Sequence, residues 1–487
     1  MVRNFMCWKR DRSTIEVLVI LCVLVSSCRG LEASAKSVHC DVQKDDNKIV
    51  VSCSHRNIDS ITSWPQEVNA IDKGLIDQIR ISYYNNTIKN VTKLPPLAGN
   101  KISLGFTANQ IAEIEESAFS NVDRIVSLDL GSNRITGQVL RSEIFQGPYK
   151  NNVYGDISLQ ILNLAHNEIH SLDRYLFQHT PNLTSLFLNN NPLETLDHVS
   201  VLAISSATNL QTLDLSYTEI DSIPMATFSN LMYLRYIDLS GNKFITVPES
   251  LNLVGGSLET LTFNNNSIEE LNDDSFVGLR KLQQLEVSNN EYLLEVKRST
   301  FSPLVNLKIL HLCHNPKLRY ISHNAFRGLK DKWTLSEVYL NDNHLSELST
   351  DLMPWSKLEI LGMTKNNWLC NCDLADIVTT QKAGEKFKPK DIPVCAAPMK
   401  LSGAYITDIS LTYCPTFDST FLPKKNFSLS DLKPRHVLWS IFGVASVVCV
   451  GMLIGLMVNY TKRFYKKQLR SQSGVNYSNL NEDLTDA

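Results

Sequence analysis

Two histidines and one cysteine that lie close together have the clearest capacity for chemistry in this sequence. His311, Cys313 and His314 form the pattern His-x-Cys-His. Imidazole nitrogens and thiolate sulfurs are the usual protein ligands of zinc. The corresponding positions of the flanking segments offer Glu286 and Tyr339, which do not complete a ligand set. We therefore predict no bound metal here.

Motifs of the common catalytic classes are missing from the sequence. It has no P-loop, no Gly-x-Ser-x-Gly and no His-Glu-x-x-His. The formal net charge of its 487 residues is −3, which gives no sign of the basic face of a nucleic-acid-binding protein. We predict a protein that is not an enzyme, needs no cofactor and does not bind nucleic acid.

The segments around these residues repeat the pattern Leu-x-x-Leu-x-Leu-x-x-Asn-x-Leu. Consecutive copies start about two dozen residues apart, at Leu210, Leu234, Leu258, Leu282 and Leu307. One unit is a short strand with a return loop, which cannot bury its leucines alone. Stacked units bury them in a continuous core, while the asparagine side chain bonds to the backbone of the turn. The sequence predicts an α/β solenoid, a leucine-rich repeat horseshoe.

The array extends in both directions and is expected to cover residues 76–367. Further copies begin at Ile76, Lys101, Ile125, Leu159, Leu183, Leu335 and Leu358. A phenylalanine recurs in the return arm, which we interpret as a core spine on the convex side: Phe119, Phe145, Phe177, Phe228, Phe276, Phe301 and Phe326. Two units run long and must form loops, which could expose Tyr149, Tyr154 and Trp333.

Cysteines mark both ends of the array. In the N-terminal cap, residues 36–75, a secreted chain favours a disulfide between Cys40 and Cys53. The other end reads Trp368-x-Cys370-x-Cys372, followed by a helical stretch, Cys395 and Cys414. By counting alone, four cysteines allow three pairings. Cys313 is then left over, as a buried thiol or a site for pairing with another chain.

The C-terminal cysteine pattern, over residues 368–414, resembles the cap of extracellular leucine-rich repeat proteins, single-pass type I cell-surface proteins among them. The resemblance covers residues from about Cys40 to Cys414 and includes PMKLSGAYI after Cys395. It implies that Cys370 pairs with Cys395 and Cys372 with Cys414. The N-terminal cap departs from the family, which commonly has four cysteines where this chain has two.

Two apolar segments predict how the chain meets the membrane. Residues 1–30 read as a signal peptide, with a basic start and the apolar run VLVILCVLV. Residues 437–458 carry no charge and are long enough for one transmembrane helix. Basic residues follow closely, from Lys462 to Arg470, and this places residues 459–487 in the cytoplasm. Residues 415–436 would form a polar stalk outside the plasma membrane.

Ligand contacts are expected on the concave face, where strand alternation directs the residues between the leucines. An aromatic patch of Phe187, Tyr217 and Tyr236 across three adjacent repeats is our first choice, together with Asp238 and Tyr339. The alternative is that polar residues at these positions only keep the face soluble.

Short motifs predict modification and sorting. Sequons on the external side begin at Asn85, Asn90, Asn182, Asn265 and Asn426. In the tail, Tyr477 and Leu480 form a Tyr-x-x-apolar motif that resembles an endocytic sorting signal. Gly451 and Gly455 lie four apart in the apolar segment, a spacing that supports helix pairing and a homodimer.

These observations lead to a recognition protein at the plasma membrane. We expect a receptor or adhesion protein that binds an extracellular or cell-surface protein ligand through its ectodomain. Two alternatives stay open: an endocytic co-receptor that uses Tyr477, and a structural organiser of apical extracellular matrix. The sequence names neither the ligand nor the pathway.

Overall fold

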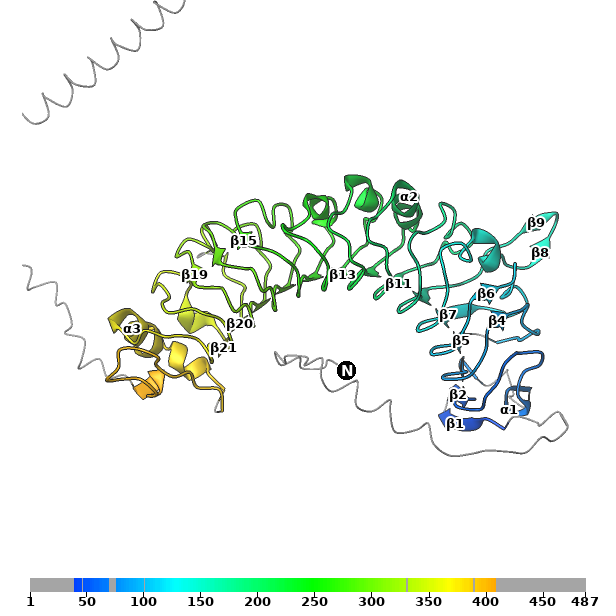
Figure 1. Cartoon of the computed structure of the whole chain (residues 1–487), viewed down its shortest axis with the longest axis horizontal. Helices are drawn as coiled ribbons and strands as arrows, with labels where there is room; N and C mark the ends of the chain where they lie inside the picture. The colour runs from blue at the N-terminus through cyan, green and yellow to red at the C-terminus, as the bar shows by residue number, and fades with distance from the viewer. Residues whose placement is uncertain are drawn as a thin grey trace, which may run out of the picture. The chain divides into compact units, whose positions relative to one another are not determined.

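A single curved sheet organises the described part of the chain. The computed structural model describes residues 39–45, 47–69, 76–99, 101–329, 332–388 and 390–408. Within them a 14-stranded sheet lines the inner side of the arc (Figure 1). Its first pair is antiparallel and all later pairs are parallel. In order, its strands are β1 (Asp41–Asp45), β2 (Lys48–Ser52), β3 (Gln78–Ser82), β5 (Lys101–Gly105), β7 (Ile125–Asp129), β10 (Ile161–Asn163), β11 (Ser185–Phe187), β12 (Thr212–Asp214), β13 (Tyr236–Asp238), β14 (Thr260–Thr262), β16 (Gln284–Glu286), β18 (Ile309–His311), β20 (Glu337–Tyr339) and β21 (Ile360–Gly362).

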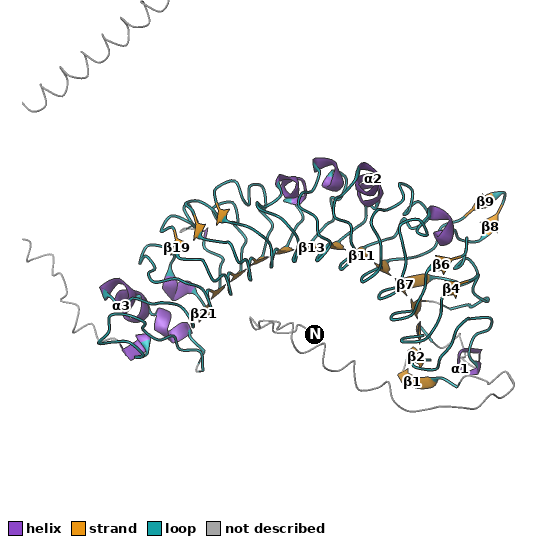
Figure 2. Cartoon of the chain, in the orientation of Figure 1, coloured by secondary structure: helices purple, strands orange, loops and turns teal. Residues whose placement is uncertain are grey.

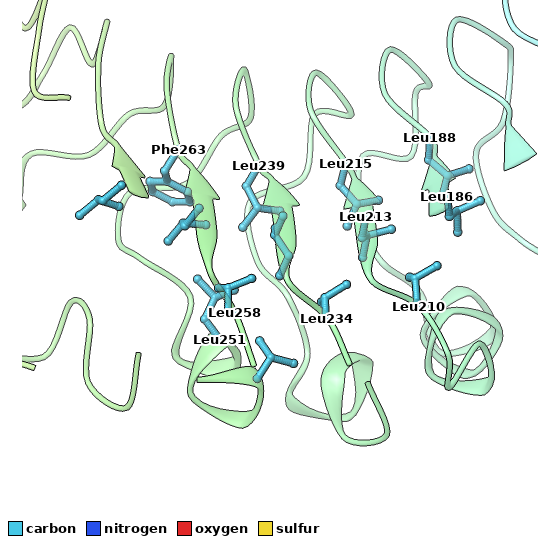
Figure 3. Close-up of a cluster of buried hydrophobic side chains, with 14 of the residues drawn as sticks. Leu186, Leu188, Leu210, Leu213, Leu215, Leu234, Leu239, Leu251, Leu258 and Phe263 are labelled. Atoms are coloured by element: carbon cyan, nitrogen blue, oxygen red, sulfur yellow. The ribbon is translucent and has the colours of Figure 1, made fainter. Parts of the chain in front are cut away.

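The repeat leucines form the core that joins these strands. Each copy of the pattern contributes one strand, and its three leucine positions point away from the concave surface. Leu210, Leu213 and Leu215 are completely buried, as are the matching residues of the next repeat. Figure 3 shows these side chains stacked in layers from one repeat to the next. The expected repeat solenoid is therefore present.

The return arms hold little α-helix. Figure 2 shows short helical turns on the outer side of the arc and strands on the inner side. The fold is thus a β-solenoid with a smaller helical share than an α/β solenoid suggests. The outer elements are β4 (Asn90–Val91), β6 (Glu113–Ile114), η2 (Ser142–Phe145), α2 (His198–Ser206), η3 (Met225–Phe228), η4 (Glu249–Val254), β15 (Glu270–Leu271), β17 (Glu295–Val296), β19 (Tyr320–Ile321) and η6 (Trp355–Lys357).

The recurring phenylalanines lie where the sequence predicts, inside the outer arm. All seven are buried. Several rings stack on those of the next repeat, with centroids 6.1 Å apart for Phe276 and Phe301 and 4.8 Å apart for Phe301 and Phe326. Such pairs add to the burial of their apolar area and hold adjacent return arms together.

The repeat asparagines form a ladder inside the turns. The Nδ2 of Asn242 donates to the carbonyl oxygens of Leu215 and Leu239, at 2.8 and 3.0 Å. Its Oδ1 accepts from the backbone N–H of Thr218 at 3.1 Å. Because strands this short leave turn backbone unpaired, a buried amide satisfies those groups in most repeats. In the repeat of β12 the same position is Thr218, whose hydroxyl donates to the Leu215 carbonyl oxygen at 2.7 Å.

Caps close both ends of the core. At the N-terminus, β1 pairs with β2, α1 (Gln66–Asn69) follows, and a disulfide joins Cys40 to Cys53. At the C-terminus, α3 (Cys372–Thr379), η7 (Ala383–Lys386) and η8 (Ile406–Asp408) follow the last strand. A disulfide joins Cys370 to Cys395. Cys372 is also disulfide-bonded, and its expected partner Cys414 lies outside the described residues.

The two long units leave the solenoid in different ways. The first forms a hairpin of β8 (Tyr149–Lys150) and β9 (Val153–Tyr154), which projects from the outer side (Figure 1). Tyr149 and Tyr154 are exposed there, with ring centroids 4.8 Å apart. In the second, Trp333 is half-buried and packs edge-on against Phe326, as local packing predicts.

Candidate functional site

The concave face presents two columns of side chains. Strand pairing aligns Phe187 with Asp214, Asp214 with Asp238, and Asp238 with Thr262, and the same column continues through Glu286 and His311 to Tyr339. The other column aligns Ser185, Thr212, Tyr236 and Thr260. The buried leucines alternate with both columns, so side chains from many repeats share one surface.

The centre of this surface is acidic. We call Asp214, Asp238 and Glu286 the acidic column. The Oδ1 atoms of Asp214 and Asp238 each accept the backbone N–H two residues later, at 2.9 Å. Glu286 accepts from the side chains of Gln284 and Asn264, at 2.7 and 3.2 Å. The hydrogen bonds hold three carboxylates in fixed positions on one face.

Burial and mutual repulsion perturb this column. Partial burial and the charges of Asp214 and Glu286 raise the pKa of Asp238 from 3.8 to about 6, against the opposing hydrogen bonds from Ser240. Burial also raises the pKa of Asp214. Burial, and then the charge of Asp238, raises the pKa of the Tyr236 hydroxyl. A cationic group of a ligand would relieve this repulsion.

A second cluster lies toward the C-terminal end of the face. The rings of His311 and Tyr339 are parallel, with centroids 4.5 Å apart. The Tyr339 hydroxyl donates to Glu337 at 2.8 Å, and the Lys388 ammonium lies 5.7 Å from the ring centroid. Burial lowers the pKa of His311. Since Lys388 follows η7, the C-terminal cap contributes to the concave surface.

The structure does not bring the predicted aromatic patch together. Phe187 and Tyr236 are half-buried on the concave face, but they lie in different columns, with β12 between their strands. Tyr217 lies beyond the end of β12, in the turn, and is 41% exposed. Asp238 and Tyr339 lie on the concave face as expected. Tyr236 with the acidic column is therefore the more compact candidate site.

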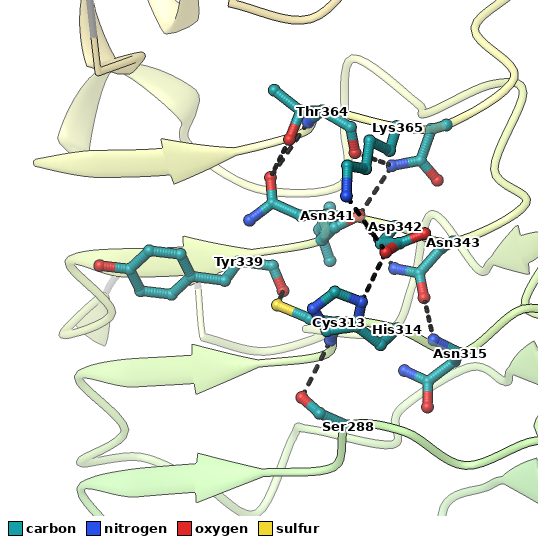
Figure 4. A network of polar contacts seen from close by, with 12 residues as sticks. Ser288, Cys313, His314, Asn315, Tyr339, Asn341, Asp342, Asn343, Thr364 and Lys365 are labelled. Atoms are coloured by element: carbon teal, nitrogen blue, oxygen red, sulfur yellow. Dashed lines mark hydrogen bonds and ion pairs between the residues drawn. The ribbon is translucent and has the colours of Figure 1, made fainter. Parts of the chain in front are cut away.

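The three side chains of the His-x-Cys-His pattern make separate contacts, and Figure 4 shows those of Cys313 and His314. His311 faces the concave side. Cys313 is completely buried and disulfide-bonded, with its Sγ 3.5 Å from the Tyr339 carbonyl oxygen, so it is not the buried free thiol that the sequence allowed. The Nδ1 of His314 lies 2.6 Å from Asp342, whose carboxylate also lies 3.6 Å from Lys365. Among the described residues, no group of three or more potential ligands is arranged to hold a metal ion.

Only some of the residues predicted to be modified lie in the described part of the structure, and the predicted membrane segments do not. Asn85, Asn90, Asn182 and Asn265 are exposed, and Asn426 lies outside the described residues. The expected signal peptide, stalk, transmembrane helix and tail, with Tyr477 and Leu480, also lie outside them. In the part of the chain that the structure covers, no helix has the length and apolar character to span a membrane.

Sequence comparison agrees with the fold. The leucine-rich repeat family model matches residues 157–206, 194–244 and 254–291. The chain is 26% identical to Tsukushi from Gallus gallus over 266 residues, 54% of this chain and 67% of that protein. It is 31% identical to Toll-like receptor 3 from Boselaphus tragocamelus over 267 residues, which are 54% of this chain and 26% of that protein. Keratocan from Gallus gallus is 29% identical over 210 residues, 42% of this chain and 54% of that protein.

One solved structure aligns with part of this chain. Human 5T4 (Wnt-activated inhibitory factor 1, trophoblast glycoprotein) aligns with 48% of this chain and 87% of its own, with 24% identity and a TM-score of 0.39. That score is too low to support an argument about function. The repeat pattern, the stacked sheet and the family match together show that this chain contains leucine-rich repeats, with disulfides in the caps at both ends.

Proposed function

We propose that this protein is a cell-surface receptor or adhesion protein that binds a protein ligand through its concave face. The observation that carries the proposal is the acidic column with Tyr236, held by repeats that align many side chains on one surface. Solenoids of this kind use their concave surfaces for binding. Buried tyrosines concentrate binding energy, and fixed carboxylates select a partner of complementary charge.

The proposed ligand presents basic side chains to the centre of the arc. Asp214, Asp238 and Glu286 would pair with them, and Tyr236 would pack against their aliphatic stems. Because Asp238 is partly buried and repelled by its neighbours, pairing with a cation lowers its pKa and favours the complex at neutral pH. The proposed role is binding without a chemical reaction. The apolar residues of the repeats pack in the core, and the residues between them form the binding surface.

The proposed topology is single-pass type I, with the repeats outside the plasma membrane and residues 459–487 inside. Epitope tags placed after the signal peptide and at Ala487 test it directly. On intact cells, antibody should reach only the first tag, and the second should require permeabilisation. Labelling of the Ala487 tag on intact cells would refute this topology.

A cell-aggregation assay distinguishes a self-binding protein from one with another ligand. Non-adherent cells would express the full-length protein or the variant Phe187→Ala, Tyr236→Ala at matched surface levels. Aggregation that the variant loses would indicate pairing between two copies through the concave face. Aggregation that the variant keeps would count against that face. Without aggregation, the soluble ectodomain, residues 36–415, is screened against secreted and cell-surface proteins.

A further inference from the structure

One turn position after each strand of the central repeats has a left-handed backbone. We call this line of residues the turn ridge: Asn190, Tyr217, Gly241, Asn265, Asn289, His314, Asp342 and Lys365, with φ between 53° and 70°. Their N–H groups donate to carbonyls of the next repeat, for example Tyr217 to Ser240 at 2.7 Å and Gly241 to Asn264 at 2.8 Å. The ridge runs along one edge of the sheet.

Tyr217 has the largest side chain of the turn ridge. Glycine and asparagine tolerate a positive φ, but a bulky aromatic residue there has a backbone strain on the order of 1 kcal/mol or more. Its φ is 56°. The residue at the next ridge position is Gly241, where any Cβ atom would overlap the Tyr217 ring. The absence of a side chain at Gly241 therefore leaves space for the Tyr217 ring, which is 41% exposed.

The ring reaches a second ridge residue beyond Gly241. The Nδ2 of Asn265 donates a hydrogen bond to the Tyr217 hydroxyl, at 3.0 Å. Asn265 is exposed and opens the sequon Asn265-Asn266-Ser267. In N-glycosylation the sugar is attached to this Nδ2 atom. Three successive ridge residues thus place an exposed aromatic ring beside an acceptor amide.

We propose that Asn265 carries an N-linked glycan whose first sugar packs on the exposed ring of Tyr217. The proposal rests on the extracellular location proposed above. The anomeric carbon of an N-acetylglucosamine, delivered as a lipid-diphosphate-linked oligosaccharide by the cell's transferase, bonds to Nδ2. The bond to the diphosphate breaks, and the amide loses one proton. The remaining N–H can still donate to the Tyr217 hydroxyl.

The arrangement assigns Tyr217 a role separate from the acidic column. An apolar sugar face packs on an aromatic ring much as an aliphatic chain does, and the fixed ring limits the glycan's freedom. The glycan then lies along the turn ridge, at one edge of the concave face. A protein ligand would reach Tyr236 and Asp238 from the side away from that edge.

The test measures glycan release site by site from the full-length protein made in animal cells. Variants are Tyr217→Asn, which carries the residue of ridge positions 190 and 289 and so suits the backbone, and Tyr217→Phe, which keeps the ring. Asn182 is the internal control, because it is an exposed sequon that lies off the turn ridge. The native protein is treated with an N-glycosidase, and mass spectrometry follows the peptides of Asn265 and Asn182.

The proposal expects Asn265 to be glycosylated and its glycan to be released several-fold more slowly in the wild type than in Tyr217→Asn. Tyr217→Phe should release at an intermediate rate, and Asn182 at one rate in all three. Equal release at Asn265 in the wild type and Tyr217→Asn would overturn the packing on Tyr217. An unmodified Asn265 beside modified Asn90 and Asn182 would overturn the site. If no sequon is modified, the extracellular location itself fails.

Discussion

At the scale of single residues, Asp238 shows most directly how a folded surface changes chemistry. Its ordinary surroundings would be water, but here it is partly buried and faces Asp214 and Glu286, which raises its pKa from 3.8 to about 6. The carboxylate stays in place because its Oδ1 accepts the Ser240 N–H. It is a polar group whose charge the fold tolerates at a cost in stability.

We predict that Asp238→Ser, which removes the carboxylate without creating a sequon at Ser240, changes the pH dependence of stability. Between pH 4 and 6 the folded wild type holds a proton at Asp238 that the unfolded chain releases. Its stability from this group is therefore present below pH 4 and lost as the pH rises through about 6. A serine hydroxyl can still accept the Ser240 N–H, although more weakly, and it does not titrate. Between pH 4 and pH 7 the variant should therefore gain roughly 1–3 kcal/mol relative to the wild type.

Thermal unfolding of the ectodomain across this pH range checks the effect. The matched control is Glu259→Gln, which removes an exposed carboxylate beside Arg235. A stability difference between Asp238→Ser and the wild type that is the same at pH 4 and pH 7 would contradict the raised pKa.

The sequence predicted the buried residues of the repeats well, but not how the side chains of the concave face and its turns are arranged. The leucines, phenylalanines and ladder asparagines have a fixed period, so their burial follows from stacking. The separation of Phe187, Tyr217 and Tyr236 could not be predicted in this way. A residue's position in the repeat tells which strand or turn it belongs to, but not where a turn side chain such as Tyr217 points. The left-handed ridge had a usable signal: Asn, Gly and Asp recur just before the ladder asparagine.

At the scale of elements, the asparagine ladder replaces the backbone pairing that three-residue strands cannot provide. We predict that Asn242→Ala destabilises the ectodomain by roughly 2–4 kcal/mol, because it leaves the buried backbone N–H groups of Thr218 and Ile220 without an acceptor. It also removes one of two donors from the carbonyl oxygens of Leu215 and Leu239. Asn209→Ala is the control, since its exposed amide makes one bond, to the Pro181 carbonyl at 2.9 Å. Chemical denaturation should separate the two, and equal effects would argue against the ladder.

The C-terminal cap should protect the repeat next to it more than distant ones. We predict that Cys370→Ser, Cys395→Ser costs about 2–5 kcal/mol and speeds amide hydrogen exchange in β21. Repeats contact mainly their neighbours, so exchange in β7 should hardly change. Exchange that rises equally in β7 and β21 would indicate that the array unfolds as one cooperative unit.

At the scale of the whole molecule, the repeats supply a long surface and the expected membrane segments supply its location. The family match and the described sheet account for the first. The location is inferred from the sequence, namely from the expected signal peptide, the apolar residues 437–458 and the basic residues up to Arg470. The repeat architecture could be predicted because each unit repeats the same short pattern of core residues. The ligand depends on the surface residues between them, whose types do not repeat.

The most direct test of the account is a binding measurement with matched variants of the ectodomain. Labelled residues 36–415 are applied to arrayed cell-surface and secreted proteins, including the ectodomain itself. The concave variant is Tyr236→Ala, Asp238→Ser, which creates no new sequon. The control is Tyr233→Ala, Glu259→Gln, which changes the same kinds of residue at one exposed and one half-buried position in the turns before β13 and β14. We predict a specific partner whose binding the concave variant loses and the control keeps. A partner lost by the control but kept by the concave variant would contradict the assignment of the concave face.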